Sequence, residues 1–281
     1  MNIVPLKGPL ALTNSGELEV VFLGTGTAFA SELNQTNFLI IKGDTHILVD
    51  LGMTGPKALA EVGLKAEDIT TILPTHSHAD HIGGIEYLAL RNRYVAIPSG
   101  RPKITMISTD EYHTILWNES LRGGLEYNEI TSEGKRLTLE DYFNLQLATP
   151  VPGTLNRPLY RIKYGEITLE LFHTNHIPGA AEFTRDAFIT YGLMIDDRVF
   201  VSGDTKFDTD LIEHYGPKAE FIFHDASLMP NAVHASINDL KTLPKSIREK
   251  MMLMHYQDET RDEHASDFSG LAKQQVRYIF P

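Results

Sequence analysis

One short run of residues constrains the fold of this chain more than any other feature. Three histidines and an aspartate stand between an apolar stretch at 69–73, which predicts a strand, and one at about 82–90, which predicts a helix. A strand end is a rigid place to mount ligands. Imidazole and carboxylate groups suit Zn²⁺ and its neighbours, and the chain has no cysteine that could supply a thiolate. The run therefore predicts a metal site rather than a solvated turn, with the candidate ligands His76, His78, Asp80 and His81.

Three more candidate ligands end or follow predicted strands later in the chain. They are His176, Asp204 and His255. Strand ends at one edge of an α/β sheet are where open sites assemble. Together with the first run, the chain offers seven ligands, which is too many for one four-coordinate metal and fits two metals that share a bridge.

The order of the predicted elements repeats between the two halves of the chain. Strands joined by hairpin turns come first, and strands that alternate with helices follow. The predicted strands are 17–24, 37–42, 46–51, 69–73, 103–108, 159–164, 167–172, 188–195, 199–202, 221–224 and 251–254, and the predicted helices are 54–62, 82–90, 208–215, 237–249 (interrupted near Pro244) and 266–275. This order predicts two packed sheets with helices outside, in one domain over residues 1–281 with an irregular insertion at about 94–160.

The charge and hydropathy of the chain limit the partners it can bind and the cellular compartment we expect for it. Lys and Arg number 25 against 37 Asp and Glu, a net charge of −12. Such a surface repels polyanions, although a local positive site could still hold a small anion. The sequence has no apolar run of 18 residues, and residues 1–12 are broken by Pro5, Gly8 and Pro9 and lack the core of a signal peptide. We expect a cytoplasmic protein without a membrane segment.

These residues together resemble the metallo-β-lactamase superfamily. The resemblance also rests on the FLGTG segment at 22–26, the ILVDLG segment at 47–52 and the SGDT segment at 202–205, so it covers nearly the whole chain. It implies an α/β fold, a four-layer αββα sandwich with a dinuclear metal site. It also implies that His76, His78 and His176 hold one metal, that Asp80, His81 and His255 hold the other, that Asp204 bridges them, and that Asp50 orients a ligand.

Two divalent cations, Zn²⁺ or alternatively Mn²⁺, suit hydrolysis. A metal can lower the pKa of bound water to about 7, so that hydroxide is available at neutral pH. The cations can also stabilise charge on a phosphoryl oxygen, while Asp80, Asp204 and hydroxide offset part of their charge.

Two later segments resemble the short loops of the tRNase Z branch of the superfamily. They are the HDAS segment at 224–227 and the HAS segment at 234–236. The resemblance implies that His234 is the general acid that protonates the leaving oxygen and that Asp225 orients it. The candidate catalytic residues are therefore Asp80, Asp225 and His234, and the plainer alternative is a turn-capping Asp225 with a surface His234.

The chain departs from tRNase Z in ways that favour a small substrate. Only 28 positions separate His176 from Asp204, where tRNase Z carries a long arm, and this stretch predicts a hairpin. Residues 25–37 carry no positive charge. The pattern is similar to the small phosphodiesterases of the branch, including the cyclic-nucleotide phosphodiesterases that phages and bacteria encode against Pycsar defence.

The leading hypothesis is a phosphodiesterase that hydrolyses small cyclic nucleotides. The alternatives are a tRNase Z-like endoribonuclease, a lactonase or thioesterase on the same metal core, and a metal protein that sequesters a nucleotide without cutting it. Aromatic and arginine side chains in the insertion could select the substrate, or could pack into the core or a homodimer interface, in which case the insertion would cover the partner's site. They are Tyr112, His113, Trp117, Arg122, Tyr127 and Arg136.

Overall fold

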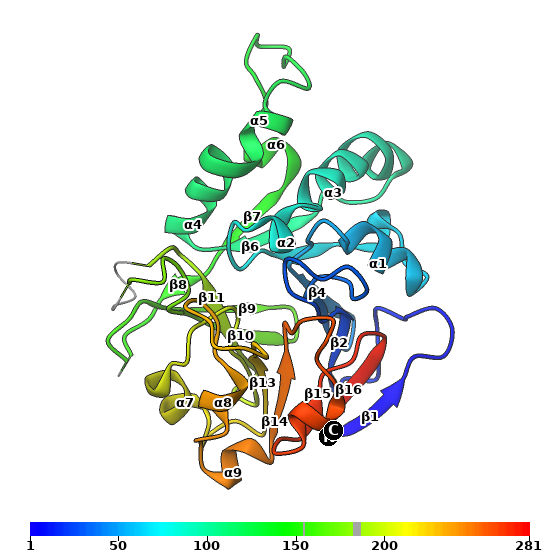
Figure 1. The fold of residues 1–281 in the computed structure, drawn as a ribbon. Coiled ribbons are helices and arrows are strands. Elements are labelled where there is room, and N and C mark those ends of the chain that lie inside the picture. Colours follow the sequence, from blue (N-terminus) through cyan, green and yellow to red (C-terminus); the bar gives the residue numbers. More distant parts are fainter. Residues whose placement is uncertain (154, 182–186) are drawn as a thin grey trace. The chain divides into compact units, whose positions relative to one another are not determined.

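The computed structural model describes residues 1–153, 155–181 and 187–281, and the chain divides into two compact units (Figure 1). Unit one consists of Met1–Gly24, Asn37–Ala148 and Gln275–Pro281, and unit two of Thr25–Thr36 and Thr149–Gln274. Among the described residues, no helix has the length and apolar character needed to cross a membrane. That residues 1–281 act as a single domain stays a prediction.

Unit one is built on an eight-stranded sheet. Its strands, in spatial order, are β1 (Asn2–Pro5), β16 (Val276–Phe280), β2 (Leu18–Gly24), β3 (Asn37–Lys42), β4 (Thr45–Val49), β5 (Thr71–Leu73), β6 (Thr105–Ser108) and β7 (Asn144–Leu147). Its α-helices are α1 (Gly55–Glu61), α2 (Ala79–Ile82), α3 (Ile85–Arg91), α4 (Asp110–Ile115), α5 (Arg122–Leu125) and α6 (Leu139–Tyr142).

Unit two is built on a second eight-stranded sheet. Its strands, in spatial order, are β15 (Gly270–Leu271), β14 (Met251–Met254), β13 (Phe221–Asp225), β12 (Val199–Val201), β11 (Tyr191–Ile195), β10 (Ile167–His173), β9 (Leu159–Tyr164) and β8 (Thr149–Pro150). Its α-helices α7 (Thr209–Tyr215), α8 (Ile237–Leu240) and α9 (Lys245–Arg248) lie beside this sheet in Figure 1, and their apolar side chains share one core with β12, β13 and β14.

The two sheets have the same internal order. Strands β1, β16, β2, β3 and β4 pair antiparallel and β4 to β7 pair parallel. Likewise, β8 to β12 pair antiparallel and β12 to β15 parallel. The predicted succession of hairpins and then strand–helix alternation is confirmed in each unit. Parallel strands end at the same edge of a sheet, so the segments that follow them gather there.

The predicted final helix at 266–275 is wrong. Turns and the short strand β15 occupy this stretch, and Gly270 has a φ of 115°, a conformation that a side chain disfavours. The chain then continues as β16, between β1 and β2. The interruption predicted near Pro244 is confirmed, because α8 and α9 lie on either side of it.

The stretch at 94–160 is more regular than the sequence predicts. It contains α4, α5, α6, β6 and β7, and β7 forms an edge of the first sheet. Residue 154 of this stretch lies outside the described residues. So do residues 182–186 of the hairpin predicted between His176 and Asp204.

The buried His46 on β4 makes the stability of the protein depend on pH. Its Nε2 atom accepts a hydrogen bond from the backbone N–H of Thr70 at 3.1 Å, so the ring is neutral. Burial, partly opposed by Asp68, lowers the pKa of His46 to about 4. An unfolded histidine, with a pKa of about 6.5, takes up its proton first as the pH falls. The unfolding free energy should therefore fall by about 3 kcal/mol as the pH drops from about 6.5 to about 4.

Chemical denaturation of the metal-free protein across this pH range checks the His46 prediction. The His46→Gln variant keeps a polar side chain but does not titrate. Its unfolding free energy should therefore depend less on pH than that of the wild type, and equal pH dependences would count against the assignment.

Candidate active site

In unit one, the histidine run follows the end of β5. His78 precedes the first residue of the short helix α2, which contains Asp80 and His81. The Nε2 atom of His76 lies 3.0 Å from Nδ1 of His78, and the ring centroids of His76 and His81 are 4.0 Å apart. The structure thus brings the imidazoles of the predicted run together within unit one.

Asp50 supports this cluster from the end of the neighbouring strand β4. Its carboxylate accepts hydrogen bonds from the N–H and the hydroxyl of Thr75, each at 2.7 Å, and lies 2.7 Å from Nδ1 of His81. Burial raises the pKa of Asp50, and His81 and Thr75 oppose this rise. Its backbone has a φ of 60°, in the left-handed region, a strain of the kind found at functional sites. The geometry fits the predicted role of Asp50 in orienting His81.

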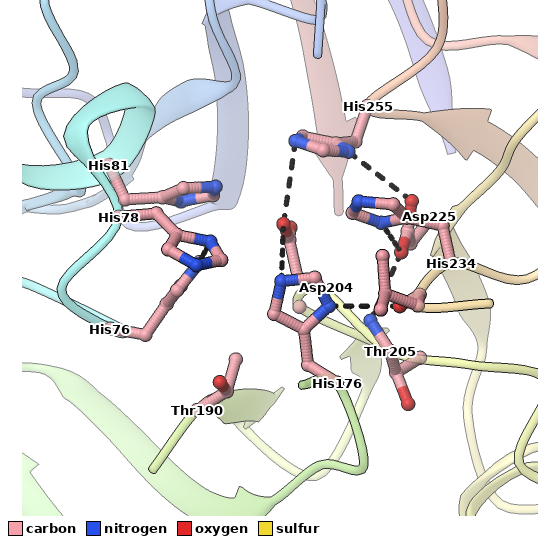
Figure 2. Close-up of polar contacts among 12 residues, drawn as sticks. His76, His78, His81, His176, Thr190, Asp204, Thr205, Asp225, His234 and His255 are labelled. Carbon is pink, nitrogen blue, oxygen red and sulfur yellow. Dashed lines mark hydrogen bonds and ion pairs between the residues drawn. The ribbon is translucent and has the colours of Figure 1, made fainter. Parts of the chain in front are cut away.

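In unit two, polar side chains gather where β10, β12, β13 and β14 end (Figure 2). The Oδ2 atom of Asp204 lies 3.4 Å from Nε2 of His255 and 3.9 Å from Nε2 of His176. His255 also has a backbone in the left-handed region, with a φ of 54°. The three candidate ligands of this unit are buried. The parallel pairing of β12, β13 and β14 brings Asp204 and His255 to one edge, and β10 brings His176 there because β10 and β12 both pair antiparallel with β11 and so run the same way.

The ring nitrogens of these histidines are arranged as metal ligands require. In His176, Nδ1 lies 2.9 Å from the carbonyl oxygen of Val233, which can only accept, so the proton sits there and Nε2 keeps its lone pair. In His255, Nδ1 faces a carboxylate oxygen of Asp225 at 3.3 Å, and Nε2 faces Asp204. In His81, Nδ1 likewise faces Asp50. A ligating histidine usually has its second nitrogen fixed in this way. The donor set fits divalent metals.

Asp225 and His234 form a close pair next to these ligands. The Nδ1 atom of His234 lies 2.7 Å from Oδ2 of Asp225, which also accepts the backbone N–H of Thr205 at 3.0 Å. Figure 2 shows both contacts. Burial disfavours the charged form of both groups. The attraction between the two groups outweighs burial, so the pKa of His234 is raised and that of Asp225 is lowered. His234 therefore holds a proton more firmly than an ordinary histidine. One ring nitrogen of His234 also lies within 4.8 Å of ligand atoms of His176 and Asp204.

The sequence matches the model of one protein family over most of its length. Residues 18–278 match the family described as "Anti-Pycsar protein Apyc1". This chain belongs to the Anti-Pycsar Apyc1 family.

Individual relatives of this Apyc1-family chain agree with the match. The Anti-Pycsar protein Apyc1 of Paenibacillus xerothermodurans is 37% identical over 245 residues, which cover 86% of this chain and 89% of the relative. That of Bacillus phage BSP38 is 33% identical over 251 residues, which cover 87% of this chain and 91% of the relative.

The fold is shared with solved structures at lower identity. The metallo-β-lactamase fold protein YhfI from Bacillus subtilis superposes with a TM-score of 0.68 at 17% identity, over 94% of this chain and 99% of YhfI. The predicted α/β fold of the metallo-β-lactamase type is confirmed.

In this Apyc1-family member, the aromatic residues singled out at 94–160 mostly have partners in their own unit. Tyr112 is fully buried, and its hydroxyl lies 3.1 Å from the hydroxyl of Ser77, inside the histidine run. Arg136 lies over the ring of Tyr127 at 4.1 Å, and Arg122 pairs with Glu126 at 3.0 Å. Burial favours the packing interpretation for Tyr112, whereas Tyr127 is 63% exposed and its contact with Arg136 lies at the surface. Sequence reasoning missed the contact of Tyr112 with Ser77, because nothing local to either residue marks it.

Proposed function

We propose that this chain is a metal-dependent hydrolase, and more specifically a phosphodiesterase that opens the ring of small cyclic nucleotides. The observation that carries the proposal is the Asp225–His234 pair, a proton donor held by a buried carboxylate beside His255 and Asp204. Family membership supports it, since the relatives are described as Anti-Pycsar proteins.

The proposal assigns the metal ligands as the sequence motifs imply. His76, His78 and His176 would hold one divalent cation, Asp80, His81 and His255 a second, and Asp204 both, with Zn²⁺ or Mn²⁺ as the metal. When bound, such cations lower the pKa of water toward neutrality and stabilise negative charge on a phosphoryl oxygen.

The protein's own side chains complete the reaction. Water adds to the phosphorus and gives up a proton to the solvent, the bond from phosphorus to a ribose oxygen breaks, and His234 gives its proton to that oxygen and regains one from the solvent. Asp225 holds the imidazole through Nδ1 and stabilises its charged form, so that Nε2 can donate. Asp80 and Asp204 contribute negative charge that offsets the cations.

The charge of the chain supports a small substrate in place of a nucleic-acid polymer. The net charge is −12, and residues 25–37 contain no lysine or arginine. A polyanion gains affinity mainly by contacts with positive side chains. A homodimer and a cytoplasmic setting stay predictions.

Removing the metal should abolish turnover. We expect the purified protein to hydrolyse a 3′,5′- or 2′,3′-cyclic nucleotide with Zn²⁺ or Mn²⁺, to lose this activity after chelation, and to regain it when metal returns. Metal analysis of the same preparation should find two equivalents per chain. The absence of turnover on every cyclic nucleotide, in a preparation shown to contain metal, would remove the proposed function.

A further inference from the structure

Unit two contains a cavity of about 360 Å³ beside His234 that the chemistry above does not use. Its walls come from residues 27–31, from 231, 233 and 234, and from 257–259. Ligand pockets range over about 300–1,000 Å³, so this one has room for a single small group and not for a length of nucleic acid.

The loop that forms one wall is fixed in place by Asp258. The carboxylate accepts hydrogen bonds from the backbone N–H groups of Ser31 at 2.7 Å and of Glu32 and Leu33 at 3.1 Å, and from the hydroxyl of Ser31 at 3.1 Å. Burial would raise the pKa of Asp258, but these donors outweigh it and lower the pKa. The N–H of Thr27 also donates to the carbonyl of Tyr256, at 3.3 Å. The segment on either side of Phe29 is therefore anchored.

Phe29 lies in this anchored loop with 96% of its surface exposed. A single exposed aromatic ring is ordinary on a protein surface. Phe29 and His234, however, both line the same cavity. A flat face presented by a rigid loop suits stacking, because little freedom is lost when a ligand binds.

The charge of the cavity lining shows which part of a ligand it can accept. Away from His234, the lining residues include Asp258 and Glu259 and no lysine or arginine. This part of the wall repels a phosphate and accepts an uncharged group that carries hydrogen-bond donors. Every nucleobase has a face that an aromatic ring can stack on.

We propose that Phe29 stacks on the base of the nucleotide, while the phosphodiester lies at His234. This inference rests on the proposed function and adds to it a residue that determines specificity. It assigns the anionic and the uncharged ends of the substrate to separate parts of unit two.

The Phe29→Ala variant should raise KM for a 3′,5′-cyclic nucleotide by about 5- to 150-fold, the equivalent of about 1–3 kcal/mol per stacked base. The loss should fall on KM more than on kcat, because the ring touches no reacting atom. The Phe29→Trp variant keeps an aromatic ring, so its KM should stay close to that of the wild type. Glu32→Ala is the matched control, since Glu32 is exposed in the same loop and does not line the cavity, and it should behave as the wild type.

A substrate without a base separates stacking from a general loosening of the site. The KM for 1-deoxyribose 3′,5′-cyclic phosphate should change by less than about twofold in Phe29→Ala, because no base is present to stack. An equal rise in KM for both substrates would overturn the proposal, and so would an unchanged KM for the nucleotide.

A binding measurement keeps this test distinct from that of the proposed function. If the wild type hydrolyses nothing, calorimetry with a non-hydrolysable phosphorothioate analogue of the 3′,5′-cyclic nucleotide decides. Weaker binding to Phe29→Ala than to the wild type supports stacking. Equal affinities, or no binding by the wild type, refute it.

Discussion

Replacing His234 by alanine should lower kcat for a 3′,5′-cyclic nucleotide by about 10²–10⁴-fold, the contribution of a positioned general acid. The bond that breaks leaves an alkoxide on ribose, which departs slowly unless it receives a proton. His234 is the group placed to supply that proton, because Asp225 lies 2.7 Å from its Nδ1 atom and raises its pKa against the effect of burial.

A substrate with a good leaving group provides the internal control for His234→Ala. The p-nitrophenolate released from bis(p-nitrophenyl) phosphate needs no proton, so the variant should hydrolyse this compound at close to the wild-type rate. Metal analysis should find the same metal content in both proteins. An equal loss on both substrates would assign His234 a structural or ligating role.

A second histidine variant tests whether the effect is specific to the site. His214, on α7 in the same unit, pairs with Lys218 at 3.0 Å and belongs to none of the groups of possible metal ligands among the described residues. The His214→Ala variant should keep the wild-type kcat. Undiminished turnover of the cyclic nucleotide in His234→Ala would remove the general-acid role. Undiminished turnover of an ester or lactone, with none of the cyclic nucleotide, would favour the lactonase or thioesterase alternative, which needs no such acid.

The parts of the fold that the sequence predicts well are those set by local patterns. The bounds of β3, β9 and β14 agree with the prediction to the residue. Each is a short apolar-rich run, and β3 and β9 are bounded by glycine or proline. The final strand β16 was missed because its residues gain their partners from β1 and β2, at the other end of the chain. The edge strand β7 is half polar and carries little pattern of its own.

The residues of the candidate site also fall into those that local sequence patterns predict and those that they do not. The histidine run and the residues after strands could be found because their types and positions are visible in one segment at a time. The groups that hold those residues could not be found, because they lie far away in sequence. The carbonyl of Val233 fixes His176 across 57 positions, and Asp258 anchors the loop of Phe29 across more than 220. A backbone carbonyl is present at every residue, so its role cannot be predicted from the residue type. Asp258 stands in a polar stretch, and nothing near it in the sequence indicates the N–H groups that it binds.

Arg157 and Asp208 are far apart in the sequence but form a buried ion pair. Breaking this pair should lower the unfolding free energy more than breaking an exposed ion pair. Their side chains are only 7% and 11% exposed, and the guanidinium bonds both carboxylate oxygens, at 2.8 and 3.3 Å. Arg157 also donates to the carbonyl of His173 at 3.1 Å, and Asp208 caps α7 through the N–H of Leu211. The pair thus ties the segment before His176 to the segment after Asp204.

The Arg157→Met variant should lower the unfolding free energy by about 3–5 kcal/mol, because it leaves the Asp208 carboxylate buried without its counter-charge. Adding Asp208→Asn removes that charge but keeps a helix cap, so the double variant should recover part of the loss. Arg161 offers the matched control: it pairs with Asp197 at 2.6 Å, but the side chains are 42% and 68% exposed. Arg161→Met should therefore cost less than about 1 kcal/mol. Chemical denaturation followed by circular dichroism measures all three, and equal losses in Arg157→Met and Arg161→Met would show that burial does not set the strength of these pairs.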